Sequence, residues 1–298
     1  MKNFFFAFIF GLTAASAQAD LKVFATVPEW GALAKEIGGD KVKVYTATNA
    51  FQDPHRIEAK PSLLAQARQA DLVIAAGADL EIGWLPLVLR DSGNSAIQPG
   101  RPGYFEAAAV VNRLEVPTTL DRSHGDIHAA GNPHTHLDPR NVLKVGAALT
   151  ARLVELDAAN AAAYQAGYQA FAGKWQAAMV RWQKEAAPLK GVPVLVHHAS
   201  FVYLLNWLGM TEVGTLEPKP GIEPTSGQLT GLLARQQSVP AKMVLRAAYQ
   251  QEGPSQWIAG KTGMPAVLLP YTVGGTPEAK DLLGLFDDTV QRLLKGLL

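Results

Sequence analysis

The sequence predicts an α/β protein of two lobes, each with a parallel sheet flanked by helices, joined by a long rigid helix. Short β-branched runs alternate with helical stretches in two separate blocks, one over 21–76 and one from Val192 onward. Alternation of this kind is typical of parallel sheets with helices on both faces. The length of 298 residues also corresponds to two domains at roughly 150 residues each.

The elements of each block follow from short apolar runs and the stretches between them. In the first block we expect strands over 23–26, 42–46 and 72–76, with helices near 30–37 and 61–70. In the second block we expect strands over 192–197, 243–247 and 266–269, a helix near 254–262 and a last helix from Asp281. The two blocks therefore predict two similar halves.

A helical segment over 139–187 links the two blocks. Apolar residues recur there at steps of three and four, in two sets: Val142, Val145, Leu149, Leu153 and Leu156, then Tyr164, Tyr168, Phe171, Trp175, Met179 and Trp182. This spacing marks one face of a helix, so we interpret these side chains as core rather than as a ligand-stacking surface. A stiff helix between lobes would resist large hinge opening, and the cleft between lobes is a usual place for a ligand.

The first residues have the pattern of a secretory signal peptide. Lys2 gives a positive start, an apolar stretch runs from Phe4 to Ala15, and Ala17-Gln18-Ala19 forms a small-residue cleavage site. The apolar stretch is shorter than the roughly 20 residues that cross a bilayer. We therefore expect a signal peptide over 1–19, an N-terminal lobe over 20–138, the linking segment over 139–187, a C-terminal lobe over 188–298, and a soluble mature protein in the periplasm.

Composition excludes several classes of function. The formal charge of +1 falls to zero once Lys2 is removed with the signal peptide, so nothing favours a nucleic-acid partner. The chain has no cysteine. Disulfides, thiolate zinc sites, a cysteine nucleophile and a lipid-modified cysteine at the cleavage site are therefore excluded.

All seven histidines fall in three short segments. His55 follows a strand and a loop, and His197 and His198 end a buried strand, where open α/β sheets place their ligands. Only one of two successive side chains on a strand can face a given cleft. The middle segment has His124, His128, His134 and His136. Four imidazoles in a glycine-containing loop indicate a transition-metal site of the zinc, copper or nickel type, the alternative being a solvated polar loop.

Three motifs in order resemble those of a known family. Asp53-Pro-His-x-x-Glu58, Asn132-Pro-His-x-x-Leu-Asp138-Pro and His198-x-x-Phe201-x-Tyr203 are similar to the successive motifs of the zinc and manganese solute-binding proteins of ABC importers, the cluster A-I family. The resemblance covers almost the whole mature chain. It implies a metal site between the lobes with His55, His134 and His198 as ligands. His136 then stands where the family usually has an aromatic residue and His197 precedes the matching position, so both are expected to be loop, packing or supporting residues.

The resemblance has a gap at the fourth ligand. Family members often add an Asp or Glu just after the last strand, but residues 268–275 contain no carboxylate. Tetrahedral zinc normally takes four ligands, so a water, Glu58, Glu252 or a histidine of the 124–136 loop remain open as the fourth. Three imidazoles with few carboxylates favour Zn²⁺ over Mn²⁺, which prefers harder oxygen ligands.

Two carboxylates and a loop near these motifs have more than one interpretation. Asp138 and Glu58 have the chemistry to orient a ligating histidine, but Asp138-Pro139 is typical of a helix N-cap with proline at the first helical position. The Pro-rich loop 217–225 is interpreted as rigid structure that could shape a docking face.

The resemblance implies a periplasmic zinc-binding subunit that captures the ion and delivers it to a cognate ABC permease in the inner membrane. We expect a monomer with no catalytic activity. One alternative is a periplasmic zinc buffer or metallochaperone that uses the histidine loop. The other is a zinc hydrolase with an open coordination position, but the sequence has neither an HExxH helix nor a G-x-S-x-G elbow.

Overall fold

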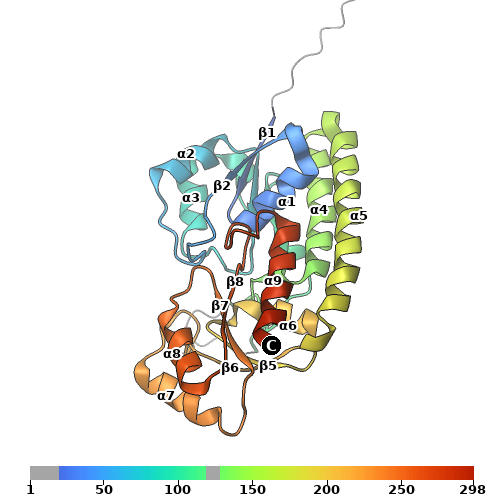
Figure 1. Cartoon of the computed structure of the whole chain (residues 1–298). Helices are drawn as coiled ribbons and strands as arrows, with labels where there is room; N and C mark the ends of the chain where they lie inside the picture. Colours follow the sequence, from blue (N-terminus) through green and yellow to red (C-terminus); the bar gives the residue numbers. More distant parts are fainter. Residues whose placement is uncertain (1–19, 119–127) are drawn as a thin grey trace, which may run out of the picture.

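The computed structural model describes residues 20–118 and 128–298. The expected signal peptide and His124 lie outside these residues. The described chain forms two parallel four-stranded sheets flanked by helices, one in each half of the molecule, which confirms the predicted fold class (Figure 1). No helix of this described part is both long enough and apolar enough to cross a membrane.

The N-terminal sheet has the strand order β2-β1-β3-β4. Its strands are β1 (Leu21–Ala25), β2 (Val42–Thr46), β3 (Leu72–Ala75) and β4 (Tyr104–Glu106). Its helices are α1 (Pro28–Gly38), α2 (Pro61–Gln69) and α3 (Leu85–Ser92). The central strand β3 is buried along its whole length, as its uninterrupted apolar run predicts.

The C-terminal sheet repeats this arrangement with the order β6-β5-β7-β8. Its strands are β5 (Pro193–Val196), β6 (Thr211–Thr215), β7 (Met243–Ala247) and β8 (Ala266–Leu269). Its helices are α6 (Val202–Leu208), α7 (Ser226–Arg235), α8 (Gly253–Thr262) and α9 (Leu282–Leu297). The sequence patterns did not reveal β4 and β6, because these edge strands are short or half-exposed and lack a buried apolar run.

The linking segment contains two helices, α4 (Pro139–Leu156) and α5 (Ala161–Glu185), which lie side by side along one edge of the molecule (Figure 1). The long helix is α5, which contacts α1 of the N-terminal half and α9 of the C-terminal half. The chain reverses direction between the two helices around Asp157, whose carboxylate accepts a 2.6 Å hydrogen bond from the Tyr164 hydroxyl. The long helix α5 therefore ties the lobes together, and α4 packs beside it.

Aromatic side chains of α5 form the core that joins it to α9. Trp175 packs edge-on against Trp182 with ring centroids 5.2 Å apart, and Trp182 stacks on Phe286 of α9 at 5.1 Å. All three side chains are fully buried. The interpretation of this helical face as core is confirmed.

Gly167 of α5 allows a close approach to α1. A Cβ atom at this position would collide with the backbone carbonyl of Ile37, whereas a Cβ at Gly173, further along the same helix, would meet nothing within 4 Å. Gly167 therefore sets the spacing between the linking helix and the N-terminal half.

We predict that G167A and G173A change stability in opposite directions. G167A should lower the free energy of unfolding by about 1–3 kcal/mol, because backbone atoms must move apart to admit the methyl group. G173A should raise the free energy of unfolding by about 0.5–1 kcal/mol, because alanine favours a helix interior over glycine. Urea unfolding of both variants is the measurement, and a stabilising G167A would contradict the close packing.

Candidate metal centre

Three histidines from distant parts of the sequence meet between the two halves. His55 lies in the loop after β2, His134 lies just before the short 3₁₀ helix Thr135–Leu137, and His198 follows β5. One nitrogen of each lies within 4.8 Å of the others. The structure thus brings together the three residues that the family motifs indicated. His198 lies at the carboxyl end of β5, where α/β folds place ligands.

Hydrogen bonds connect the motifs that carry these histidines. The Asn132 side chain accepts from the His134 backbone N–H at 3.1 Å and donates to the Ala199 carbonyl at 2.8 Å. The Tyr203 hydroxyl donates to the Asn132 carbonyl at 2.8 Å. The second and third motifs therefore support each other, and this holds His134 and His198 in one relative position.

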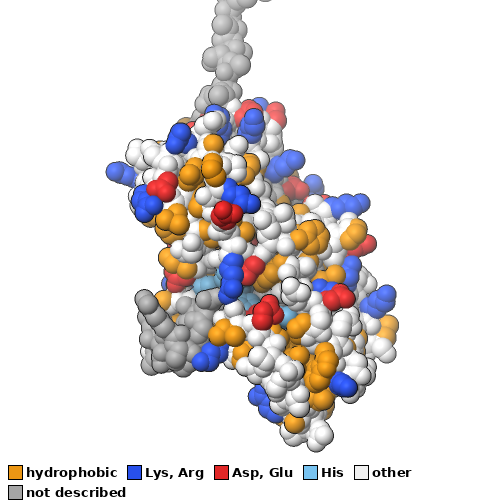
Figure 2. All heavy atoms as spheres, turned by 90° about the vertical axis from the view of Figure 1, so that its left-hand side faces the viewer, with side chains coloured by type: hydrophobic (Ala, Val, Ile, Leu, Met, Phe, Trp, Pro, Cys, Tyr) orange, Lys and Arg blue, Asp and Glu red, His pale blue; other side chains and the backbone are white. Residues whose placement is uncertain are grey.

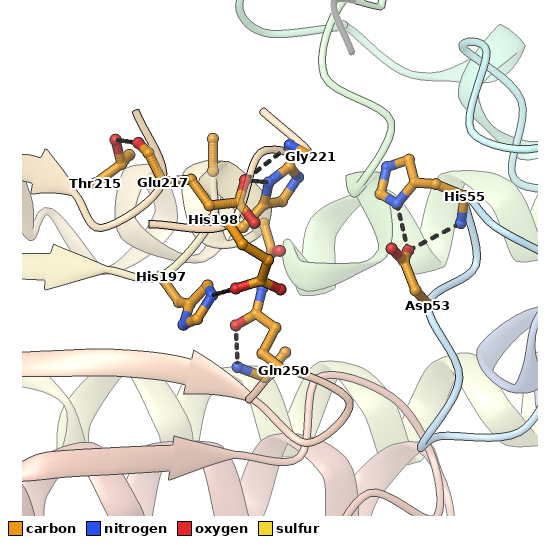
Figure 3. A network of polar contacts seen from close by, with 12 residues as sticks. Asp53, His55, His197, His198, Thr215, Glu217, Gly221 and Gln250 are labelled. Carbon is orange, nitrogen blue, oxygen red and sulfur yellow. Dashed lines mark hydrogen bonds and ion pairs between the residues drawn. The ribbon is translucent and has the colours of Figure 1, made fainter. Parts of the chain in front are cut away.

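Carboxylates orient two of the three imidazoles. Nδ1 of His55 lies 2.7 Å from Asp53 Oδ1, and Nδ1 of His198 lies 2.7 Å from Glu217 Oε2 (Figure 3). An ionised carboxylate can only accept, so each Nδ1 carries the hydrogen and each Nε2 keeps its lone pair for a metal. Glu217 also accepts from the Gly221 backbone N–H at 2.8 Å, which ties the Pro-rich loop to the site.

His134 has a different partner. Its Nδ1 lies 2.8 Å from the hydroxyl of Tyr271, which follows β8. Burial raises the pKa of Tyr271 well above its ordinary value, so the phenol stays neutral. Nε2 of His55 and Nε2 of His134 are buried and form no hydrogen bond within the described residues. Buried nitrogens without a partner are uncommon in proteins and are typical of a metal-binding centre.

The pKa shifts of His134 and Asp53 favour cation binding by this cluster. Burial, and then the neighbouring His55 and His198, hold the pKa of His134 well below its ordinary value, so its imidazole is neutral at pH 7. Burial alone raises the pKa of Asp53, but its hydrogen bond and ion pairing with His55 outweigh burial and lower that pKa. The site therefore combines a neutral His134 imidazole with carboxylates at the Nδ1 atoms of His55 and His198.

A pocket of about 160 Å³ opens beside the cluster and is lined by Glu115, His128, Asn132, His134, His198, Ala199 and Pro220. Histidine side chains are visible in the hollow between the two halves in Figure 2. The ring centroid of His128 lies 5.2 Å from that of His55. His128 therefore borders the site but does not belong to the three-histidine cluster.

The structure separates the other candidate residues from the cluster. Glu58 is 81% exposed beside Lys60, and Glu252 is 65% exposed and paired with Arg246 at 2.9 Å, so neither carboxylate belongs to the three-histidine cluster. Asp138 caps α4 by accepting from the Arg140 N–H at 2.8 Å, as the Asp-Pro sequence predicted.

The two remaining described histidines support the surroundings. His136 is buried between Glu29 and the Tyr271 carbonyl, at 3.2 and 2.9 Å, and this confirms a packing or supporting place for it. His197 is buried on the other face of the strand end, with its Nε2 3.9 Å from Glu223 (Figure 3). Of the two adjacent histidines only His198 joins the cluster.

Sequence reasoning missed three residues that contact the histidines. Asp53 belongs to the first motif, and its place two residues before His55 was the available signal. Glu217 lies in the Pro-rich loop, whose pattern indicates only rigid structure. Tyr271 gave no signal, because its contact with His134 spans 137 residues.

The fold and the cluster define a metal-binding protein with its site between two α/β lobes. The sequence profile of the family described as "Zinc-uptake complex component A periplasmic" (ZnuA) matches residues 23–296. The chain belongs to this family of metal-binding proteins of ABC importers, as its motifs indicated.

Individual relatives agree with the family assignment. The manganese ABC transporter substrate-binding lipoprotein PsaA of Streptococcus pneumoniae is 24% identical over 93% of this chain and 90% of its own length. The iron ABC transporter substrate-binding lipoprotein MtsA of Streptococcus pyogenes is 21% identical over 84% and 79%. The crystal structure of a ZnuA covers 94% of this chain and 100% of its own, with a TM-score of 0.77 and 22% identity, which shows the shared fold.

The protein is therefore the exported metal-binding component of an ABC importer and not an enzyme. Its partners are a divalent metal ion as cargo and a membrane permease.

We predict that the metal-free protein loses stability as the pH falls below about 6.5. The unfolded chain takes up a proton at His134 near the ordinary histidine pKa of about 6.5, while the folded chain, with its lowered pKa, does not. Each such proton contributes a slope of about 1.4 kcal/mol per pH unit until the folded pKa is reached. Urea unfolding between pH 7.5 and 5 in the presence of a chelator measures this slope, and H134Q should reduce it. An unchanged slope in H134Q would contradict the assignment.

Proposed function

We propose that this protein captures zinc in the periplasm and delivers it to a cognate permease in the inner membrane. The observation that supports this proposal is the convergence of three imidazole nitrogens from His55, His134 and His198. Each imidazole has its other nitrogen occupied by a polar partner, which leaves the inward nitrogens for the ion. The three are the proposed protein ligands.

The chemistry of the ligand set favours zinc over manganese. Neutral imidazoles suit zinc, whereas manganese prefers carboxylate and carbonyl oxygens. The nearby carboxylates of Asp53 and Glu217 are directed to the Nδ1 atoms of His55 and His198. We propose that a water completes a tetrahedral shell from the side of the adjoining pocket, which His128 and Glu115 help to line.

The proposed location follows from the N-terminal pattern and the composition. The streptococcal relatives are lipoproteins. This chain has no cysteine to carry a lipid, so we propose export through a cleaved signal peptide over 1–19 and a free monomer in the periplasm. The division into lobes over 20–138 and 188–298 with a linking segment over 139–187 is part of the same proposal.

We predict one tightly bound zinc per chain, lost when the three histidines are replaced. Mass spectrometry of protein purified without a histidine tag measures the metal content, and competitive titration against a chelating dye measures affinity. H55A, H134A and H198A should each weaken zinc binding by orders of magnitude, because each removes a ligand. H124A is the control and should change affinity little. Equal losses in all four variants would contradict the proposed ligand set.

We also predict that zinc affinity falls as the pH drops through the imidazole range near 6.5, because protons compete for the same nitrogens. Titration at several pH values measures the dependence. A pH-independent affinity would exclude histidine as the principal ligand.

Importer and buffer functions are distinguished in the cell. Deletion of the gene should impair growth under zinc limitation, and zinc should restore it. Wild-type protein should complement the deletion and H134A should not. Normal growth of the deletion strain under zinc limitation would favour the metal buffer.

A further inference from the structure

We infer that Tyr271 is a positioning residue for His134 and that a buried Glu29–His136 pair holds Tyr271 in place across the two lobes. The inference rests on the proposed metal site and concerns what tunes it. It is carried by one continuous set of buried contacts that starts at the first turn of α1 and ends at the ring of His134.

Tyr271 acts on His134 from the side opposite the cluster. Its hydroxyl contacts Nδ1 of His134 at 2.8 Å, and its ring packs edge-on against the imidazole with centroids 5.6 Å apart. Nδ1 and Nε2 lie on different edges of the imidazole, so a hydroxyl bound at Nδ1 does not occupy the metal position. In the tautomer that binds a metal through Nε2, Nδ1 donates its hydrogen to the Tyr271 oxygen.

The backbone of Tyr271 is held in an unfavourable conformation. Its φ is 65°, in the left-handed region that bulky residues rarely adopt. Such a conformation costs roughly 1–3 kcal/mol and persists only where the surroundings enforce it. The imidazole of His136 supplies one constraint, because its Nε2 donates to the Tyr271 carbonyl at 2.9 Å.

Glu29 contacts both His136 and the segment of the other lobe that carries Tyr271. Its side chain is buried, with Oε1 3.2 Å from His136 Nδ1 and Oε2 accepting a 2.6 Å hydrogen bond from the Thr272 hydroxyl. Glu29 belongs to α1 of the N-terminal half, whereas Thr272 follows β8 of the C-terminal half. Both carboxylate oxygens are therefore used to hold the segment that carries Tyr271.

In this arrangement the orientation of His134 depends on contacts between the two lobes, from Glu29 and His136 to the segment that carries Tyr271. His55 and His198 are held by Asp53 and Glu217, each a charged group near its own histidine in the same half. His134 instead has a neutral partner from the segment after β8, where the family often has a metal-binding carboxylate. In this chain that segment supplies Tyr271, which contacts the proposed ligand His134 and does not itself bind the metal in this proposal.

The test compares two tyrosine-to-phenylalanine variants of the full-length mature protein. Y271F removes the hydroxyl and should weaken zinc binding by about 10–100-fold, the range found when the partner of a metal-ligating histidine is lost. Y249F is the matched control, because the Tyr249 ring lies 5.2 Å from that of Tyr271 and its hydroxyl faces Ser200 at 3.4 Å. Y249F should retain wild-type affinity. Zinc competition titration is the measurement.

A second variant and a spectroscopic measurement distinguish a specific effect of Tyr271 on the orientation of His134 from a general loss of structure around the site. E29Q should weaken zinc binding by a smaller factor than Y271F, because it alters only the contact behind Tyr271. In ¹⁵N NMR spectra of the zinc-loaded protein, the Nδ1–H of His134 should exchange slowly with water in wild type and faster in Y271F. A purely structural effect would not single out this one proton.

The outcomes distinguish this inference from the proposed function. If wild-type protein binds no zinc tightly, the proposed function fails. If wild type binds tightly and Y271F binds equally well, or if Y271F and Y249F lose the same affinity, the metal site stands and the role of Tyr271 is wrong.

Discussion

The structure depends on one constraint: three imidazoles must present unprotonated nitrogens to the same point while they are shielded from water. Burial favours the neutral form of a histidine, which a metal requires, but it also leaves inward nitrogens without hydrogen-bond partners. Each such nitrogen costs about 1–3 kcal/mol in the metal-free protein. Bonds to a cation would remove this cost, so the same burial that destabilises the empty protein favours metal capture.

The groups that contact the Nδ1 atoms of the three imidazoles orient these rings. Asp53 and Glu217 determine which nitrogen of their histidine carries the hydrogen, because an ionised carboxylate can only accept. The Tyr271 hydroxyl can donate or accept, so its contact with Nδ1 positions the His134 ring without determining the tautomer. Carboxylates also compensate the charge of an incoming cation, which a hydroxyl does not. The site therefore combines two histidines held by carboxylates with one held by a neutral hydroxyl.

Contacts between the two lobes hold these groups in fixed relative positions. α5 contacts helices of both halves, and its buried tryptophans pack against Phe286 of α9. Near the metal centre, the Arg56 side chain donates to the Gly221 carbonyl at 2.6 Å, and Glu29 reaches Thr272. These contacts link the two halves on both sides of the cluster and so oppose a large opening of the cleft.

The sequence by itself determined the alternation of strands and helices, the buried face of the linking helices, the cap at Asp138 and the three histidine ligands proposed for the site. These features are encoded locally, in β-branched runs, in steps of three and four, and in short motifs that each contain their own histidine. Tertiary structure alone decided which groups stand behind those histidines. Tyr271 meets His134 across 137 residues, and Glu29 meets Thr272 across 243. No local pattern records such pairs, because the distance between two side chains that are far apart in the chain is set only by how the lobes pack.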